Sequence, residues 1–188
     1  LNDSPSNYTD SSGVVHGNYC TLSNALDKES NSGGSTFKEG NLYHYGSSSS
    51  GAWHKARCTM AIPKGDTGKW YYEVEVLAKA NNISYHIGWD DPFDHTIFAG
   101  GMGDSGYASW CYKTWDGKKR TGGTDTTYGA VIDEGDILGL GYDNGSIYFW
   151  KNGTIQDSGT AAFTGVSAAL CPTTSIYTES SAEGKLRL

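Results

Sequence analysis

The sequence has few charged residues, and basic side chains are the scarcer kind. Charged residues make up 19% of the 188 residues, with 14 Lys and Arg against 21 Asp and Glu; soluble proteins usually have roughly 25%. The formal net charge is −7. Nucleic-acid binding without sequence preference needs a concentrated basic face that neutralises phosphates. We therefore expect no nucleic-acid partner, and neutral or cationic partners fit the charge better.

Long apolar runs are also missing. No stretch approaches the roughly 20 consecutive apolar residues that a membrane-spanning helix needs. The amino-terminal segment lacks the charged and apolar regions of a signal peptide. We therefore expect a soluble chain that does not insert into a membrane.

Cysteine and histidine show no spacing that suits a metal site or a local redox pair. The cysteines are Cys20, Cys58, Cys111 and Cys171, and their wide separation excludes a zinc knuckle or a pair with two intervening residues. The last three lie among apolar or aromatic neighbours, which favours buried free thiols, while disulfides stay an open alternative. The five histidines lack ligand spacing. We expect no metal and no other cofactor.

Glycine and aromatic residues are abundant instead. The 26 Gly are about double the usual share of around 7%, which implies many turns. The 13 Tyr and 6 Trp suit half-buried strands as well as binding faces. Because the length suits one domain, we expect residues 1–188 to form a single unit. Residues 1–35 are rich in Ser, Asn, Asp and Gly, so we expect an irregular lead-in that packs against this domain.

Alternation of apolar and polar residues predicts a series of short strands. It is clearest in residues 70–77, where Tyr72, Val74 and Val76 share one face. Further strands are expected near residues 53–60, 83–89, 107–114, 137–142 and 146–151. Short, regularly spaced strands with Gly and Asn turns favour an all-β fold, a two-sheet antiparallel β-sandwich with little or no helix.

Two-residue hairpin signals punctuate this strand pattern. Asp116-Gly117 predicts a tight turn before residue 118, and Asn152-Gly153 predicts another after residue 151. A third turn is expected at residues 143–145. The basic cluster at residues 118–120 follows the first turn and is interpreted as a solvated turn rather than a phosphate site.

Several motifs occur in an order that resembles the SPRY domain family. They are residues 68–76 (GKWYYEVEV), 87–89 (IGW), 106–110 (GYASW), 128–129 (YG), 134–139 (EGDILG) and 145–153 (GSIYFWKNG). The resemblance covers residues 36–188. It implies a bent sandwich of two antiparallel sheets, similar to the concanavalin-like jelly roll, that acts as a recognition module and holds its ligand with loops. It implies no reaction.

The lead-in carries a second resemblance. Residues 2–8 (NDSPSNY) and 18–27 (NYCTLSNALD) are similar to the openings of SPRY segments in bacteriophage structural and fibre proteins. That similarity implies a place on a virion surface, in a tail or head fibre or a decoration protein, with other virion proteins as partners.

No catalytic constellation is expected. Asp90, Asp91 and Asp94 lie near aromatic residues and could suggest a glycosidase, which needs two facing carboxylates. Adjacent carboxylates point apart, however, and aspartates between a strand and a proline commonly form turns. The same three with Asp104 could bind calcium, but no EF-hand spacing is present. We predict that the chain is not an enzyme.

Loop aromatics are the predicted binding residues, because aromatic faces stack on sugars and anchor protein contacts. The predicted ligand site consists of Trp89, Asp90, Phe93, His95, Tyr107, Trp110 and Trp115. The expected ligand is a glycan or peptide on a host cell surface. The alternative is an architectural virion or scaffold domain, in which these rings are core or subunit interface, or an intracellular SPRY protein–protein interaction adaptor that binds no glycan. Solvent exposure of the rings separates the two hypotheses.

Overall fold

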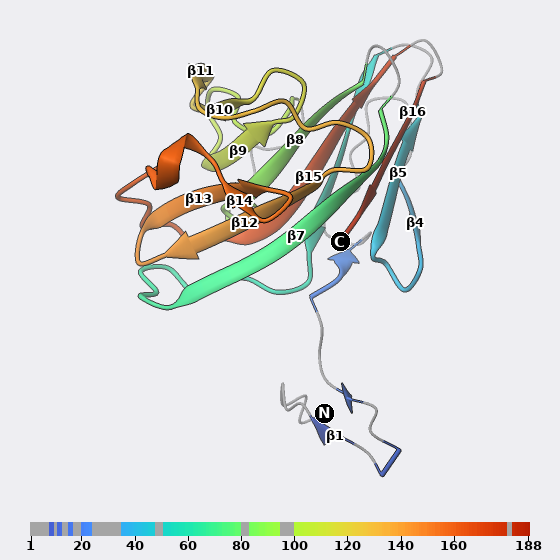
Figure 1. The fold of residues 1–188 in the computed structure, drawn as a ribbon, viewed down its shortest axis with the longest axis horizontal. Coiled ribbons are helices and arrows are strands. Elements are labelled where there is room, and N and C mark those ends of the chain that lie inside the picture. Colours follow the sequence, from blue (N-terminus) through green and yellow to red (C-terminus); the bar gives the residue numbers. More distant parts are fainter. Residues whose placement is uncertain are drawn as a thin grey trace.

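The computed structural model describes most of the chain. The described residues are 8–9, 11–12, 15–16, 20–23, 35–47, 51–79, 83–94, 100–179 and 182–188. Two antiparallel sheets of seven strands each pack face to face (Figure 1). The predicted two-sheet antiparallel sandwich is therefore confirmed. No helix among the described residues is long and apolar enough to cross a membrane.

The first sheet is built around strands β8 and β15. In order across the sheet its strands are β11 (Thr124–Thr127), β10 (Lys118–Thr121), β9 (Ser109–Lys113), β8 (Ser84–Asp90), β15 (Cys171–Thr178), β6 (Ala52–Cys58) and β3 (Leu22–Ser23). Leu22 lies opposite Cys58 in β6 and is fully buried. Residues Leu22–Ser23 of the lead-in thus form an edge strand of this sheet.

The second sheet is built around strand β7. Its strands, in order, are β14 (Thr154–Ile155), β13 (Ser146–Lys151), β12 (Ile137–Asp143), β7 (Lys69–Ala78), β16 (Glu183–Arg187), β5 (Tyr43–Ser47) and β4 (Thr36–Lys38). Outside both sheets, β1 (Tyr8–Thr9) pairs with β2 (Val15–His16), and a 3₁₀ turn, η2, spans Asp157–Gly159.

The core lies between the two sheets, as the alternation of apolar and polar residues in the strands predicts. Val74 and Val76 of β7 are fully buried, as are Leu138 and Leu140 of β12. Phe149 of β13 joins them and meets two tyrosine rings of the core edge on. Burial of apolar surface of this kind is worth roughly 25 cal/mol per Å², so the facing apolar rows hold the sheets together.

Two of the three predicted turns form as expected, and the turn at Asp116-Gly117 is longer than the two residues predicted. Asn144-Gly145 and Asn152-Gly153 both adopt positive φ angles, of 44° and 82° and of 48° and 76°, as tight hairpins require. The β9–β10 connection, however, is longer than the predicted two-residue turn because the register pairs Lys113 with Lys118. Gly117 has a positive φ of 69° there, and a Cβ at this position would lie 2.2 Å from the Gly129 carbonyl oxygen, so both features require glycine.

The prediction of a solvated turn at residues 118–120 is wrong. These residues form β10, which pairs with β9 and β11. Two carboxylates bind the Arg120 guanidinium. Its Nη2 lies 2.8 Å from Asp104, and its Nη1 donates a hydrogen bond to Asp125. Opposite charges across neighbouring strands stabilise a sheet, so a basic run can occupy a strand here.

Candidate functional site

A gap in the second sheet lies beside a hollow at one edge of strand β7. Strand β16 pairs with β7 only as far as Arg187, which lies opposite Glu75. On its other side β7 pairs with β12 from Lys69 to Glu75. Within the described ranges, no strand lies beside residues 69–74 on the β16 side. A groove of about 510 Å³ occupies that position.

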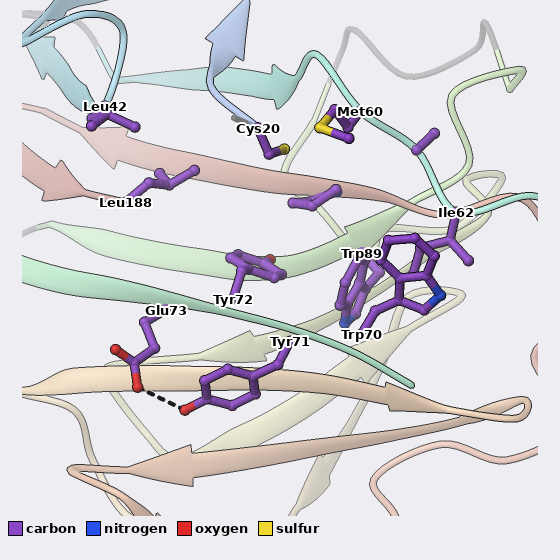
Figure 2. A pocket seen from close by; sticks show the side chains of 12 residues that line it. Cys20, Leu42, Met60, Ile62, Trp70, Tyr71, Tyr72, Glu73, Trp89 and Leu188 are labelled. Carbon is purple, nitrogen blue, oxygen red and sulfur yellow. Dashed lines mark hydrogen bonds between the residues drawn. The ribbon is translucent and has the colours of Figure 1, made fainter. Parts of the chain in front are cut away.

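We call this hollow the edge groove. Its lining residues are Cys20, Leu42, Met60, Ala61, Ile62, Trp70, Tyr71, Tyr72, Glu73, Trp89, Pro172 and Leu188. Figure 2 shows Cys20 and Met60 on one side and Tyr71 and Glu73 on the other. Glu73 is the only Asp, Glu, Lys or Arg among these lining residues. The groove is therefore apolar with one carboxylate at its rim.

The floor of the edge groove is a fixed pair of aromatic rings. Tyr72 points inward from β7 and meets the Trp89 ring of β8 edge on, with centroids 4.9 Å apart. The Tyr72 hydroxyl donates a hydrogen bond to the Gly88 carbonyl. Burial raises the pKa of this phenol well above its usual value, so it stays a neutral donor. Because the two rings belong to different sheets, they set the depth of the groove.

The rim carries exposed aromatic side chains. Trp70 is 43% exposed, and its indole nitrogen donates to Asp66 over 2.7 Å. Tyr71 is 53% exposed, and its hydroxyl donates to the Glu73 carboxylate over 2.8 Å (Figure 2). Partial burial, followed by the contact with Glu73, raises the pKa of Tyr71 to about 12. Both rings are thus exposed to solvent, and each is oriented by a side-chain hydrogen bond.

The rim continues onto the outer face of the second sheet. A shallower hollow of about 370 Å³, here called the outer hollow, is lined by Lys69, Trp70, Tyr71, Gly141, Tyr142, Asp143, Tyr148, Trp150 and Ile155. Two glycines of β12 let rings lie close to the sheet: a Cβ at Gly139 would lie 2.2 Å from the Tyr71 hydroxyl, and one at Gly141 would lie 2.7 Å from the Trp150 ring. Aromatic rings therefore line this hollow, with the Tyr71 ring edge on to that of Trp150.

The cysteines are free thiols, and three of them gather at one side of the edge groove. Cys58 and Cys171 are buried in a small cluster against which Cys20 packs. A hydrogen bond from Cys58 lowers the pKa of Cys20 to about 7, while burial raises the pKa of Cys111 and Cys171. Cys20, which lines the groove, is thus the thiol that ionises near neutral pH.

Three of the predicted ligand residues, Trp89, Asp90 and Trp110, lie on the neighbouring strands β8 and β9; the first two are buried and Trp110 is partly buried. Trp89 is 2% exposed, and Trp110, opposite it in β9, packs partly buried against the same core. Asp90 is fully buried, with Lys55 and Arg57 at 2.8 and 2.9 Å. The structure therefore gives Asp90 an internal ion pair and Trp89 a place on the groove floor.

The remaining predicted residues divide between the two ends of this strand pair, with Tyr107 at the Phe93 end, where the Ala108 carbonyl accepts from the Asp91 amide. Phe93, which is 75% exposed, follows the carboxyl end of β8 and lines a small hollow of about 180 Å³. Trp115, 52% exposed, follows β9. Because β8 and β9 are antiparallel, these two rings lie at opposite ends of the strand pair. Tyr107 is half-buried just before β9, and His95 lies outside the described residues.

The aspartates weighed as glycosidase or calcium groups have separate tasks. Asp91 accepts a hydrogen bond from the Phe93 amide, and Asp94 accepts one from the Ala108 amide, each over 2.9 Å. Asp104 pairs with Arg120. In the described part of the chain, no three His, Cys, Asp or Glu side chains gather as a metal site would require.

Of the groove residues, the sequence predicts only Trp89 as a ligand residue. Trp70 and Tyr71 were assigned to a half-buried strand, and Met60 to another. The one local signal is an aromatic pair, Trp70-Tyr71, at the start of a strand, where one of the two must face outward. Nothing local shows that β16 stops opposite Glu75.

Comparison with known proteins agrees with this architecture. The SPRY domain family matches residues 69–186. The SPRY domain of human HERC1 superposes with a TM-score of 0.62 at 16% identity, covering 81% of this chain and 90% of that one. A second human SPRY domain gives 0.56 at 17% identity, with 81% and 92% covered.

Stonustoxin gives a TM-score of 0.60 at 16% identity, covering 89% of this chain and 26% of the toxin chain. At these identities the similarities establish the fold alone. No curated protein gives a significant match. SPRY domains are typically non-catalytic modules for protein–protein interaction, and the family match spans more than half of the sequence. The chain belongs to the SPRY domain family.

Proposed function

We propose that this SPRY domain is a recognition module that binds a segment of a partner protein in the edge groove. The observation that carries the proposal is the groove itself: an apolar hollow of about 510 Å³ with two exposed aromatic side chains at its rim. Pockets of this size with few polar groups are the usual form of a binding site. The partner class follows from the typical role of the family.

Rigid aromatic residues support the proposal. Trp70 and Tyr71 expose large apolar surface at little cost in side-chain entropy, because hydrogen bonds to Asp66 and Glu73 already orient them. Interface residues of these types commonly carry much of the binding energy. Because Tyr72 and Trp89 fix the floor, a ligand meets a preformed surface.

A glycan is the second candidate ligand, and the outer hollow is the observation that favours it. The rings of Tyr71, Tyr148 and Trp150 line it, with the Lys69–Asp143 ion pair at 3.0 Å beside them. Aromatic faces suit the C–H faces of sugars, and the ion pair offers donors and acceptors for hydroxyl groups. The exposed rings of Phe93 and Trp115 stay further candidates for such contacts.

The biological setting stays a separate proposal. Attachment to a host cell from a virion surface is supported by the resemblance of residues 2–8 and 18–27 to phage SPRY segments. An architectural or adaptor role would use the same groove on a protein of the same assembly or cell. Each setting predicts a different partner, while the binding surface is common to them.

Selection from a displayed library of random twelve-residue peptides, together with a glycan array, tests the proposal. We expect enriched peptides to lose binding to the Tyr71→Ala and Met60→Lys variants and to keep it in Trp115→Ala, which removes an exposed ring elsewhere. If peptides or glycans bind the Tyr71→Ala and Met60→Lys variants unchanged but lose binding when Trp115 or Phe93 is replaced, the edge groove is not the binding site.

A further inference from the structure

Main-chain groups of β7 point into the edge groove. The Val76 amide donates to the Asp136 carbonyl over 3.0 Å, and the Val76 carbonyl accepts from Gly135 over 2.8 Å, so both groups face the β12 side. In a strand these directions alternate from one residue to the next. The amides and carbonyls of Tyr71 and Glu73 therefore face the opposite side, where the groove lies.

Strand β16 uses this same edge farther along β7. Arg187 lies opposite Glu75, and the Leu188 amide turns the other way to donate to the Leu42 carbonyl over 2.8 Å. Arg187 and Glu75 thus form a pair that faces each other. The next two positions of this kind on β7 are Glu73 and Tyr71, and no described strand lies opposite them. The edge is ready to accept about three more residues of extended chain.

The side chains around the edge indicate what such a chain would carry. A residue opposite Tyr72 would point inward, onto a floor that includes Trp89 and Ile62. A residue opposite Glu73 would point outward beside its carboxylate. The lining contains no Lys or Arg to neutralise Glu73, and the net charge of the chain is −7. A cation therefore fits this outward position.

We propose that the edge groove binds an extended partner segment as an added antiparallel strand beside Tyr71 and Glu73. In chain order the segment has a Lys or Arg opposite Glu73, a large apolar residue opposite Tyr72, and any residue opposite Tyr71. The antiparallel direction follows the rest of the sheet. This inference rests on the proposed function and adds its binding mode and sequence preference.

A synthetic peptide probe tests the binding mode. We would titrate the 188-residue chain with the amidated, acetylated peptide Thr-Lys-Leu-Thr-Val, followed by NMR, and expect binding in the micromolar to millimolar range. Methylation of the Lys main-chain nitrogen removes the bond to the Glu73 carbonyl and should weaken binding at least about tenfold. Methylation of the Leu nitrogen, which points away from β7, is the matched control and should change affinity less than about threefold.

Hydrogen exchange provides a second readout. The amides of Tyr71 and Glu73 should exchange more slowly in the complex, while those of Tyr72 and Val74, already directed at β12, should change little. A ligand that contacts only the apolar floor would not slow exchange selectively at the Tyr71 and Glu73 amides. Equal effects of the two methylations, or unchanged exchange at Tyr71 and Glu73, would overturn strand addition.

A charge exchange tests the sequence preference. Glu73→Lys should abolish binding of the Lys peptide and restore it for the peptide with Glu in place of Lys. If the Glu peptide gains nothing, the assignment of Glu73 is wrong. If the Lys peptide does not bind at millimolar concentration while library peptides still bind in the groove, strand addition fails and the proposed function stands. If neither binds there, both fail.

Discussion

The ring of Tyr72 stands perpendicular to the indole of Trp89, with centroids 4.9 Å apart and planes at 88°. The two residues belong to β7 and β8, which lie in different sheets. Their contact closes the sandwich at the point where β16 has ended. The same pair therefore belongs both to the core and to the floor of the edge groove.

Tyr72→Phe should destabilise the protein by about 1–2 kcal/mol, because the Gly88 carbonyl then loses the buried hydroxyl that donates to it. Urea unfolding followed by tryptophan fluorescence measures the change. Tyr71→Phe is the matched control: its hydroxyl bonds Glu73 at the exposed rim, so we expect a change below about 0.5 kcal/mol. Equal effects of the two changes would show that the Tyr72 hydrogen bond does not stabilise the core.

Asp90→Asn should cost about 3 kcal/mol, because it removes the carboxylate that Lys55 and Arg57 contact inside the protein. Thermal unfolding at pH 7 provides the measurement. Asp143→Asn breaks the exposed pair with Lys69 and should cost less than about 1 kcal/mol. A stable Asp90→Asn protein that loses ligand binding would instead assign Asp90 to ligand recognition.

Stability should fall as the pH drops from about 6.5 to about 4, because two buried histidines are neutral in the folded state. Burial lowers the pKa of His44 to about 3 and that of His86 to about 4, while an unfolded histidine titrates near 6.5. Between these values the unfolded chain binds more protons, so protonation favours unfolding. Each histidine should cost about 2 kcal/mol at pH 5 relative to pH 7.5.

Urea unfolding at pH 7.5 and pH 5.0 tests this dependence. The His44→Gln, His86→Gln double variant serves as control and should show a much smaller difference between the two pH values. Carboxylates with a lowered pKa, such as Asp136, lose their contribution only at lower pH. A wild-type midpoint that is the same at both pH values would contradict the neutral, buried state of the two histidines.

Cys20 should be the first cysteine to react with iodoacetamide at pH 7.5, because its pKa is about 7. Mass spectrometry of partly labelled protein identifies the site. Cys58→Ala removes the thiol that donates to Cys20, so its pKa should rise toward 9, and Cys58→Ser should restore part of the shift. Cys111 is buried and should react only on unfolding. Labelling of Cys111 before Cys20 would contradict this order.

The sequence by itself determined the elements that local rules govern. The alternation of residues 70–77 predicted β7 and its inward face, and Asn-Gly pairs predicted two hairpins, because side-chain period and positive φ preference are properties of a few adjacent residues. It also gave the ordered motifs of the SPRY family. Together these are sufficient for a two-sheet sandwich.

The tertiary structure alone decided which aromatic residues face solvent. Strand β8 is buried on both faces, because the segment around Met102 covers its outer side and accepts a hydrogen bond from His86. Period-2 alternation cannot reveal a strand covered twice, so Trp89 and Asp90 were expected in a loop-borne site. Likewise, the positions of Phe93 and Trp115 at opposite ends follow from the antiparallel register, which joins residues distant along the chain.

The edge groove cannot be predicted from the sequence, because it also depends on the pairing of segments that are distant along the chain. It exists because β16 ends opposite Glu75 while β7 continues to Lys69. That offset depends on how two segments about 110 residues apart align, and pairing register is set by the whole sheet. The sequence predicts that these residues form a strand. Only the pairing of β16 with β7 shows that one edge of this strand has no described partner.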